Sequence, residues 1–310
     1  MGLPGMYPSH INGWRREDQS SRASKISSQP DFADMKKRMG SYIPSAPSSI
    51  PSDLRKFSPL RRHNQLMSQS CVANSTTRAL ENKRIQKAYS EALASGESVE
   101  QALVTAQSKH VALSRLALYF LSREEMDPPE TEKDEGSIIS IAAELLRTFG
   151  LSREEQNPAD PSDQAFWPFD LNKVFVSPTW KAMREASLHK ISAWARIATR
   201  GNDRVDDVIT NLAMGNTVVF GTTVGDNWMQ YDGSGIIAPV NGIVRGRHAT
   251  VLCGWDPAGY FWDENSWGND WGQDGFCKLA PEVVSDIDSE DFVVIEGGWE
   301  EWSQPAGAGA

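Results

Sequence analysis

The chain changes character near its middle, and this change constrains its fold more than any other feature of the sequence. Stretches rich in helix-forming residues come first, at 72–95, 99–123 and 138–149. Short apolar runs between glycine-rich turns come after Pro168 and predict strands, at 216–224, 246–256, 259–268 and 274–279. A helical half followed by a strand-rich half predicts an α+β protein with two lobes.

Composition narrows the class of protein. Apolar residues make up 39% of the 310 residues, which is enough to bury a core, and the net charge of −10 argues against a nucleic-acid partner. The chain has no run of 18 apolar residues, so we expect no membrane partner. The N-terminus lacks the basic-then-apolar order of a Sec signal peptide. The three cysteines can form at most one disulfide. We therefore expect a reduced protein in the cytoplasm or inside a phage or virus particle.

Residues 1–49 are expected to form an arm outside the folded domain. They are rich in Ser and Pro, and the first 50 residues hold seven Lys and Arg against four Asp and Glu. Such a segment does not bury enough apolar surface to fold by itself. We expect an extended basic arm or linker, for which Trp14 offers one apolar anchor. The alternative is a segment that docks on its own acidic domain and inhibits it, or that docks on an assembly partner.

The folded domain is expected to lie at 50–296. The change in character divides it into a helical lobe at about 60–170 and a β-rich lobe at about 171–296. The last residues, 297–310, include the run SQPAGAGA and are expected to form a flexible tail.

Cys71 lies where a loop turns into the first predicted helix. The first turn of a helix carries unpaired N–H groups and the positive end of the helix dipole, both of which stabilise a thiolate. This position suits a nucleophile, although a lone cysteine inside a cell is more often a small buried apolar residue. Cys253 and Cys277 lie inside apolar strands and are expected to be core residues.

A thiolate nucleophile needs a base, and the base needs a group that orients it. His248 begins the apolar run ATVLCGW, and Asn265 follows seventeen residues later at the end of the next predicted strand. Two adjacent strands of this length bring both side chains to one face of the sheet, where an amide oxygen fixes the tautomer of an imidazole. The other four histidines lie in the arm (His10), in a basic loop (His63) and in polar helical stretches where we expect them to be solvated (His110 and His189).

Gln65 lies six residues before Cys71, on the loop that leads into the helix. Acyl transfer develops a negative charge on the carbonyl oxygen, and a side-chain amide together with the backbone N–H of the nucleophile stabilises that charge. The order Gln, Cys, His and Asn therefore indicates acyl-transfer chemistry.

These residues, with their neighbours, resemble the papain-like (C1) cysteine peptidase family. The motifs that carry the resemblance are Asn64-Gln65, Ser70-Cys71-Val72-Ala73, His248-Ala249 and Asn265-Ser266-Trp267-Gly268, and the last is the most specific. Segments at 116–125, 134–150 and 167–170 are most similar to the bacterial and viral members. The resemblance covers about residues 50–279 and implies a two-lobed fold, a helical lobe and a barrel-like antiparallel sheet, with the site in a cleft between them.

The resemblance also implies a role for each residue. Cys71 would be the nucleophile, and His248 would be the general base and acid. The pKa of the Cys71 thiol would be lowered, so that the two residues form a thiolate–imidazolium pair. Asn265 would orient His248, and Gln65 would complete the oxyanion hole. Trp267 would shield the His–Asn hydrogen bond from water, and the backbone of Gly136 and Ser137 would pair with extended substrate. The implied substrate is a polypeptide, and neither a cofactor nor a metal is required.

Three positions depart from the family pattern near the nucleophile. Leu66 stands where Gly is common, Gln69 stands where the family has Gly, and Val72 stands where it has Trp. These changes keep open an inactive papain-like scaffold that serves as a structural or binding component, for example of a virus particle. A Cys-His amidase or acyl transferase is a further alternative. A metal site built from the three cysteines and His248 lacks the usual C-x-x-C spacing.

Overall fold

The computed structural model of the chain describes residues 11–17 and 52–296. Our expectations for the rest of the arm, at 1–10 and 18–49, and for the tail at 297–310 fall outside the described residues and stay predictions.

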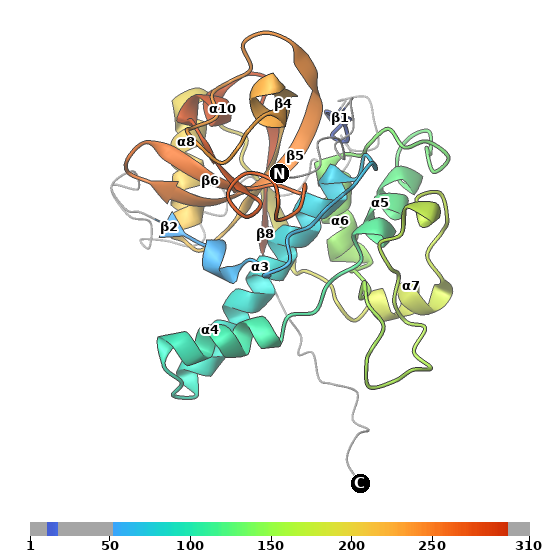
Figure 1. The fold of residues 1–310 in the computed structure, drawn as a ribbon. Coiled ribbons are helices and arrows are strands. Elements are labelled where there is room, and N and C mark those ends of the chain that lie inside the picture. The colour runs from blue at the N-terminus through green and yellow to red at the C-terminus, as the bar shows by residue number, and fades with distance from the viewer. Residues whose placement is uncertain (1–10, 18–51, 297–310) are drawn as a thin grey trace.

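Helix α3 (Cys71–Ala94) runs through the middle of the molecule (Figure 1). It corresponds to the predicted helix at 72–95, and its first half, from Cys71 to Asn82, is buried throughout. A helix that is buried on all sides needs neighbours on all sides, and α3 has helices on one side and the sheet on the other. The helices of this half are α4 (Val99–Ser108), α5 (Arg115–Glu124), α6 (Ile139–Thr148) and α7 (Trp180–Ala186).

The predicted helix at 99–123 is wrong as a single element, because the chain forms two helices there. Ser98 begins α4 with a capping box shared with Gln101. Ser114 begins α5 by accepting a hydrogen bond from the backbone N–H of Ala117. Between them, the backbone N–H of Leu113 donates to the carboxylate of Glu81 on α3, at 3.0 Å. The chain therefore turns at 109–114 because polar groups there bind its backbone.

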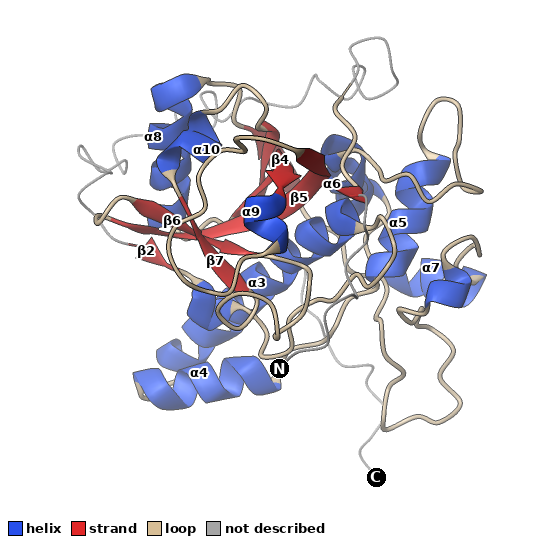
Figure 2. Ribbon diagram, turned by 45° about the horizontal axis from the view of Figure 1, so that its top comes forward, coloured by secondary structure: helices blue, strands red, loops and turns tan. Residues whose placement is uncertain are grey.

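The strand-rich half forms one mixed sheet, which contains eight strands in the described part of the chain (Figure 2). The hydrogen-bonded order is β3-β8-β4-β5-β6-β7, all antiparallel, with β1 and β2 added along β5. Their bounds are β1 Ile11–Asn12, β2 Ser52–Asp53, β3 Ala193–Arg196, β4 Val218–Gly225, β5 Val244–Asp256, β6 Tyr260–Glu264, β7 Phe276–Leu279 and β8 Glu290–Glu296. The α+β class is thus confirmed, and the expected barrel-like sheet is an open sheet with β3 and β7 at the ends of that order.

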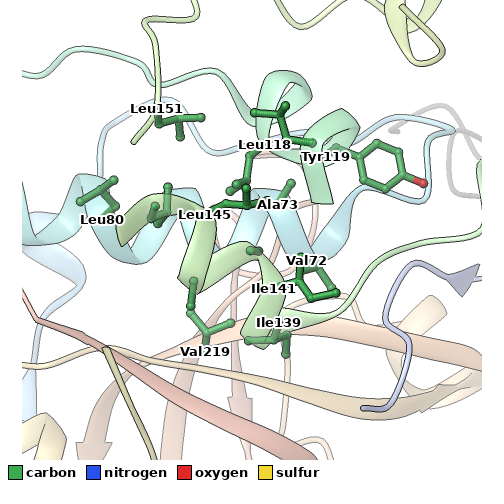
Figure 3. Close-up of a cluster of buried hydrophobic side chains, with 14 of the residues drawn as sticks. Val72, Ala73, Leu80, Leu118, Tyr119, Ile139, Ile141, Leu145, Leu151 and Val219 are labelled. Atoms are coloured by element: carbon green, nitrogen blue, oxygen red, sulfur yellow. The ribbon is translucent and has the colours of Figure 1, made fainter. Parts of the chain in front are cut away.

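Two buried clusters hold the halves together. The first joins α3, α5 and α6 to the sheet, and Figure 3 shows Val72, Ile139 and Ile141 close to Val219 of β4. The second lies mainly in the sheet half, where α8 (Gly201–Ala213) and α10 (Pro281–Ser285) pack on the strands, and it includes Ile85 of α3 and Ala106 of α4. Helix α7 lies beside the other helices (Figure 1), although it follows residue 171, where we expected the β-rich lobe to begin.

None of the helices in the described ranges has the length and apolar character needed to cross a bilayer.

A buried ion-pair cluster ties α3 to the end of β6. Arg78, two turns after Cys71, lies 3.0 Å from the Glu264 carboxylate and 3.1 Å from the Glu81 carboxylate. Glu264 also accepts a hydrogen bond from Ser58 and directly precedes Asn265. The pair therefore fixes the strand end that carries Asn265 against the helix that carries Cys71.

We predict that Arg78→Leu lowers the free energy of unfolding by about 3–5 kcal/mol, because it removes the nearest guanidinium from the buried carboxylates of Glu264 and Glu81 and leaves Glu264 with the more distant Arg62, at 3.9 Å. Urea unfolding monitored by circular dichroism measures this loss. Arg61→Leu is the matched control, because that side chain is 86% exposed and is expected to change the free energy by less than about 0.5 kcal/mol. A loss below about 1 kcal/mol for Arg78→Leu would contradict the prediction.

Candidate active site

Cys71 is the first residue of α3 and is fully buried at the junction of the two halves. Its Sγ accepts a hydrogen bond from the backbone N–H of Ala249 on β5, at 3.3 Å. Ala249 directly follows His248, so the structure brings the predicted nucleophile and the predicted base to neighbouring positions across the junction. Ser70 precedes the helix as its N-cap residue, but its side chain makes no capping hydrogen bond.

His248 and Asn265 meet as the spacing of the strands predicts. Strands β5 and β6 pair with Val251 opposite Glu264, and the imidazole Nε2 lies 2.7 Å from the Asn265 Oδ1. An amide oxygen only accepts, so the proton is on Nε2 and Nδ1 is left as the basic nitrogen. Within the described residues, Nδ1 is buried and makes no hydrogen bond. His248, which directly precedes Ala249, therefore carries a basic nitrogen that makes no hydrogen bond among the described residues.

Tryptophan rings surround the imidazole. The ring centroid of Trp267 lies 5.0 Å from that of His248, and Trp228, on the short helix α9 (Asp226–Met229), lies 6.3 Å away. Trp271 packs edge-on against Trp267, with the centroids 5.2 Å apart. All three tryptophans are buried, so the hydrogen bond between His248 and Asn265 lies in an environment of low polarity.

Gln65 is fully buried beside the Asn265 loop. Its side-chain oxygen accepts a hydrogen bond from the Ser266 hydroxyl at 2.7 Å, and its Nε2 donates to the Ser68 carbonyl at 2.9 Å. The backbone N–H of Gln65 donates to the Ser266 carbonyl at 2.9 Å. These contacts fix the orientation of the amide and join the loop before Cys71 to the loop after Asn265.

Leu66, Gln69 and Val72, which depart from the family pattern, lie in or next to the loop before α3. Leu66 has a φ of +51°, in the left-handed region that glycine adopts without strain, and the Asn64 side chain accepts from its N–H at 2.9 Å. The N–H of Gln69 donates to the Asp134 carboxylate at 2.9 Å. Val72 is buried in the first turn of α3. The loop thus compensates for the missing glycine with a side-chain hydrogen bond.

Residues 11–17 of the arm lie directly on this site. Ile11 pairs with Gly246 as strand β1, parallel to β5, and leads Gly13 onto the thiol. A Cβ on Gly13 would lie 2.5 Å from the Cys71 Sγ, which is closer than atoms in contact approach one another. The carbonyl of Gly13 accepts from the N–H of Ser137 at 3.1 Å, and the N–H of Arg15 donates to the Ser137 carbonyl at 2.9 Å. The backbone at Gly136 and Ser137 therefore pairs with an extended segment of this same chain.

Side chains of the arm hold it to both halves. Arg15 pairs with Glu130 on the helical side. Arg16 lies 2.8 Å from Asp288 and 3.2 Å from Glu290 on the sheet side. Arg15 and Arg16 of the arm thus bind acidic residues of the domain, while Glu17 of the arm binds Arg196. Nothing in the sequence indicates that Gly13 would lie on the sulfur.

Burial sets the protonation of the two reacting groups. Burial raises the pKa of Cys71 to about 12, although backbone N–H groups of Ala249 and Val72 lower it. Burial lowers the pKa of His248 to about 4, against the opposite effect of the hydrogen bond to Asn265. The expected lowering of the Cys71 pKa is therefore wrong for this arrangement, in which the arm excludes water and both groups are neutral.

The other cysteines and histidines lie away from this chemistry. Cys253 and Cys277 are buried in strands, and burial raises the pKa of each thiol well above its usual value. His63 is buried, with its ring nitrogens 3.1 Å from the Asn74 carbonyl and 3.0 Å from the Glu81 carboxylate. His189, expected to be solvated, is buried 3.1 Å from Glu185. Across residues 11–17 and 52–296, no group of three His, Cys, Asp or Glu residues is placed to hold a metal ion.

Comparison with known proteins places these features in a family. Residues 52–295 match the family model described as papain family cysteine protease. An uncharacterized peptidase C1-like protein of Acanthamoeba polyphaga mimivirus is 28% identical over 193 residues, which cover 59% of this chain and 58% of that protein. Cathepsin B-like cysteine proteinase 6 of Caenorhabditis elegans is 32% identical over 84 residues, 26% of this chain and 22% of that one. The chain thus spans less than two thirds of either relative.

Solved structures show the same fold. Xylellain, a cysteine protease from Xylella fastidiosa, superposes with a TM-score of 0.68 at 21% identity, over 96% of this chain and all of that one. Procathepsin L 3 of Tenebrio molitor superposes with a TM-score of 0.54 at 16% identity, over 83% of this chain and 71% of that one. At these identities the likeness concerns the fold alone.

We predict that His248 makes the stability depend on pH. Its pKa is about 4 in the folded protein and 6.5 in the unfolded chain, so between these values only the unfolded chain binds the proton. The free energy of unfolding then falls as the pH falls from 6.5 to 4, by up to about 1.4 kcal/mol per pH unit for this histidine.

Urea unfolding at several pH values in that window measures the slope, and His248→Gln is expected to reduce it. His63→Gln is a positive control, because burial lowers the pKa of His63 to about 3 and the same slope follows. Equal slopes for wild type and His248→Gln would contradict the prediction.

Proposed function

Because this chain belongs to the papain family of cysteine proteases, we propose that it hydrolyses peptide bonds of polypeptide substrates with Cys71 as the nucleophile. The observation that carries the proposal is the junction itself. The thiol at the start of α3 accepts from the N–H next to His248, while the imidazole is held by Asn265 with its basic nitrogen unpaired among the described residues.

The proposed reaction begins with transfer of the thiol proton from Cys71 to Nδ1 of His248. The sulfur attacks the carbonyl carbon, and the imidazolium gives its proton to the leaving amine as the C–N bond breaks. A water molecule then loses a proton to the same nitrogen and attacks the thioester, which releases the acid and restores the thiol. Asn265 holds the imidazole in one tautomer throughout, and Trp267 keeps water from their hydrogen bond.

The negative oxygen of each tetrahedral intermediate requires hydrogen-bond donors. The backbone N–H of Cys71 belongs to the first turn of α3, where N–H groups have no partner within the helix. We assign the side-chain amide of Gln65 as the second donor, because Ser266 and Ser68 fix its orientation next to the Cys71 loop.

We further propose that the arm is autoinhibitory. Gly13 lies on the sulfur, and the arm occupies the backbone of Gly136 and Ser137 with which extended substrate would pair. The carbonyl of Gly13 is engaged by Ser137, so it is not presented to the donors of the oxyanion hole. The same burial keeps the thiol and imidazole neutral, and release of the arm would admit water and favour the thiolate–imidazolium pair.

We predict that, in a chain whose arm is displaced by Gly13→Leu, Cys71→Ala abolishes both peptide hydrolysis and labelling by an epoxysuccinyl thiol probe. Cys253→Ala and Cys277→Ala in the same background are the matched controls, and each is expected to keep the labelling of the Gly13→Leu chain because its thiol stays buried in the sheet. Mass spectrometry of labelled protein identifies the modified residue. Labelling of all three cysteines at equal rates, or of none after the arm is released, would favour an inactive scaffold.

We predict that Gly13→Leu raises the rate of Cys71 labelling and of peptide hydrolysis by about tenfold or more. A side chain at this position overlaps the Cys71 sulfur and the Gln69 carbonyl, so the arm no longer lies on the site. Asn12→Leu is the control, because the Asn12 side chain is exposed and only its backbone contacts Gln69. Equal rates for wild type and Gly13→Leu would contradict the autoinhibitory role of the arm.

A further inference from the structure

The indole of Trp14 fills a pocket between the two halves of the molecule. The side chain is 1% exposed, and its Nε1 donates a hydrogen bond to the Asp291 carboxylate at 2.9 Å. The pocket exists because residue 221 is a glycine. A Cβ on Gly221 would lie 2.0 to 2.5 Å from three atoms of the indole, so even a methyl group there would exclude the ring.

The local backbone shapes the pocket. Strands β4 and β8 lose regular pairing between Val219 and Gly221, where Gly221 lies opposite Glu290. Asp291 directly follows Glu290 in the sequence, and its φ of +56° is uncommon for a residue other than glycine. Apolar residues from both halves belong to the same buried cluster as the indole, among them Ile139, Val219, Ala249 and Val293. The indole therefore lies within a buried apolar cluster, and its N–H donates to one carboxylate.

The pocket lies one residue along the arm from the residue that covers the Cys71 sulfur. Trp14 directly follows Gly13, which lies on the Cys71 sulfur, and Ser137 pairs with the residues on both sides of Trp14. An extended polypeptide bound to the same backbone at Ser137 would direct one of its own side chains into this pocket once the arm has left.

We propose that this pocket selects a tryptophan side chain of the substrate near the scissile bond, with Gly221 giving room for the ring and Asp291 accepting its N–H. The proposal rests on the proposed peptidase function and adds the substrate class that the site prefers. It makes Gly221 and Asp291 specificity-determining residues.

Charge distinguishes tryptophan from arginine, which also ends in N–H donors. Arg196 lies 4.0 Å from the second carboxylate oxygen of Asp291, and its other partner, Glu17, belongs to the arm and leaves with it. A substrate guanidinium would then meet a carboxylate already opposed by one guanidinium, inside a buried pocket. A neutral indole satisfies the carboxylate without adding a second positive charge, and phenylalanine fills the ring space but leaves the carboxylate without that donor.

The test uses the full chain with Gly13→Leu, so that the arm is displaced while the pocket is intact. Fluorogenic peptides carry Trp, Phe, Leu, Arg or Ala at each of three positions on either side of the scissile bond. At one position we expect kcat/KM for Trp to exceed that for Phe by about tenfold, the value for one hydrogen bond to a charged acceptor, and to exceed that for Arg by more.

Variants of the pocket separate its two features. Asp291→Gly tolerates the positive φ and removes the acceptor, so the ratio of kcat/KM for Trp over Phe is expected to fall to about one. Asp291→Asn keeps an acceptor oxygen and is expected to retain part of that ratio. Gly221→Ala is expected to lower the ratio for Trp over Ala by about a hundredfold, because the methyl group overlaps the ring.

Two kinds of failure are distinguishable. Cleavage of the peptides with no preference for Trp at any position, or with Arg preferred, would overturn the pocket proposal and leave the peptidase function standing. Absence of all cleavage would overturn the proposed function. In that case, binding of the Trp and Phe peptides to the Gly13→Leu variant, measured by fluorescence anisotropy, decides the pocket, and equal affinities would overturn it.

Discussion

The structure depends on the junction where the N-terminus of α3 meets β5. The buried backbone N–H of Ala249 on β5 needs an acceptor, and the Cys71 sulfur at the start of α3 supplies it. Arg78 and Glu264 reinforce the contact with an ion pair two turns further along α3. Because Asn265 follows Glu264 directly, the same pair that stabilises the fold also fixes the register of the site.

The α+β class and the positions of three candidate site residues could be predicted from the sequence, and the catalytic roles of these residues stay proposals. Cys71, His248 and Asn265 lie together because a helix start and two neighbouring strands have fixed geometry, and their spacing in the sequence reports that geometry. The break at 109–114 has one local signal, the N-cap residue Ser114, but it also depends on the Glu81 carboxylate of α3, which binds the backbone N–H of Leu113. Strand β8 was not predicted, because its partner, β4, lies more than sixty residues away in the sequence.

Protonation of the site was predicted wrongly, for a physical reason that concerns Gly13. The dipole of α3 favours a thiolate only if water or an imidazolium compensates for burial, and the arm removes the water. Composition showed that the arm was basic and that Trp14 was an apolar anchor. A glycine in a Ser- and Pro-rich segment is unremarkable in sequence, and its role becomes visible only when the distance to the Cys71 sulfur is known.

In the proposed autoinhibition, three glycines let the arm and a substrate compete for one surface. Gly13 lets the arm lie on the sulfur, Gly136 leaves room for the arm carbonyls, and Gly221 leaves room for the indole. The arm is joined covalently to the domain, so its effective concentration at the site is set by the connecting chain. A free peptide with the same contacts would not displace it at lower concentrations. The ion pairs of Arg15 and Arg16 are partly exposed, and their contribution falls as salt screens them. The contacts of Gly13 and Trp14 are buried and resist salt, so the two buried residues determine whether the arm stays in place.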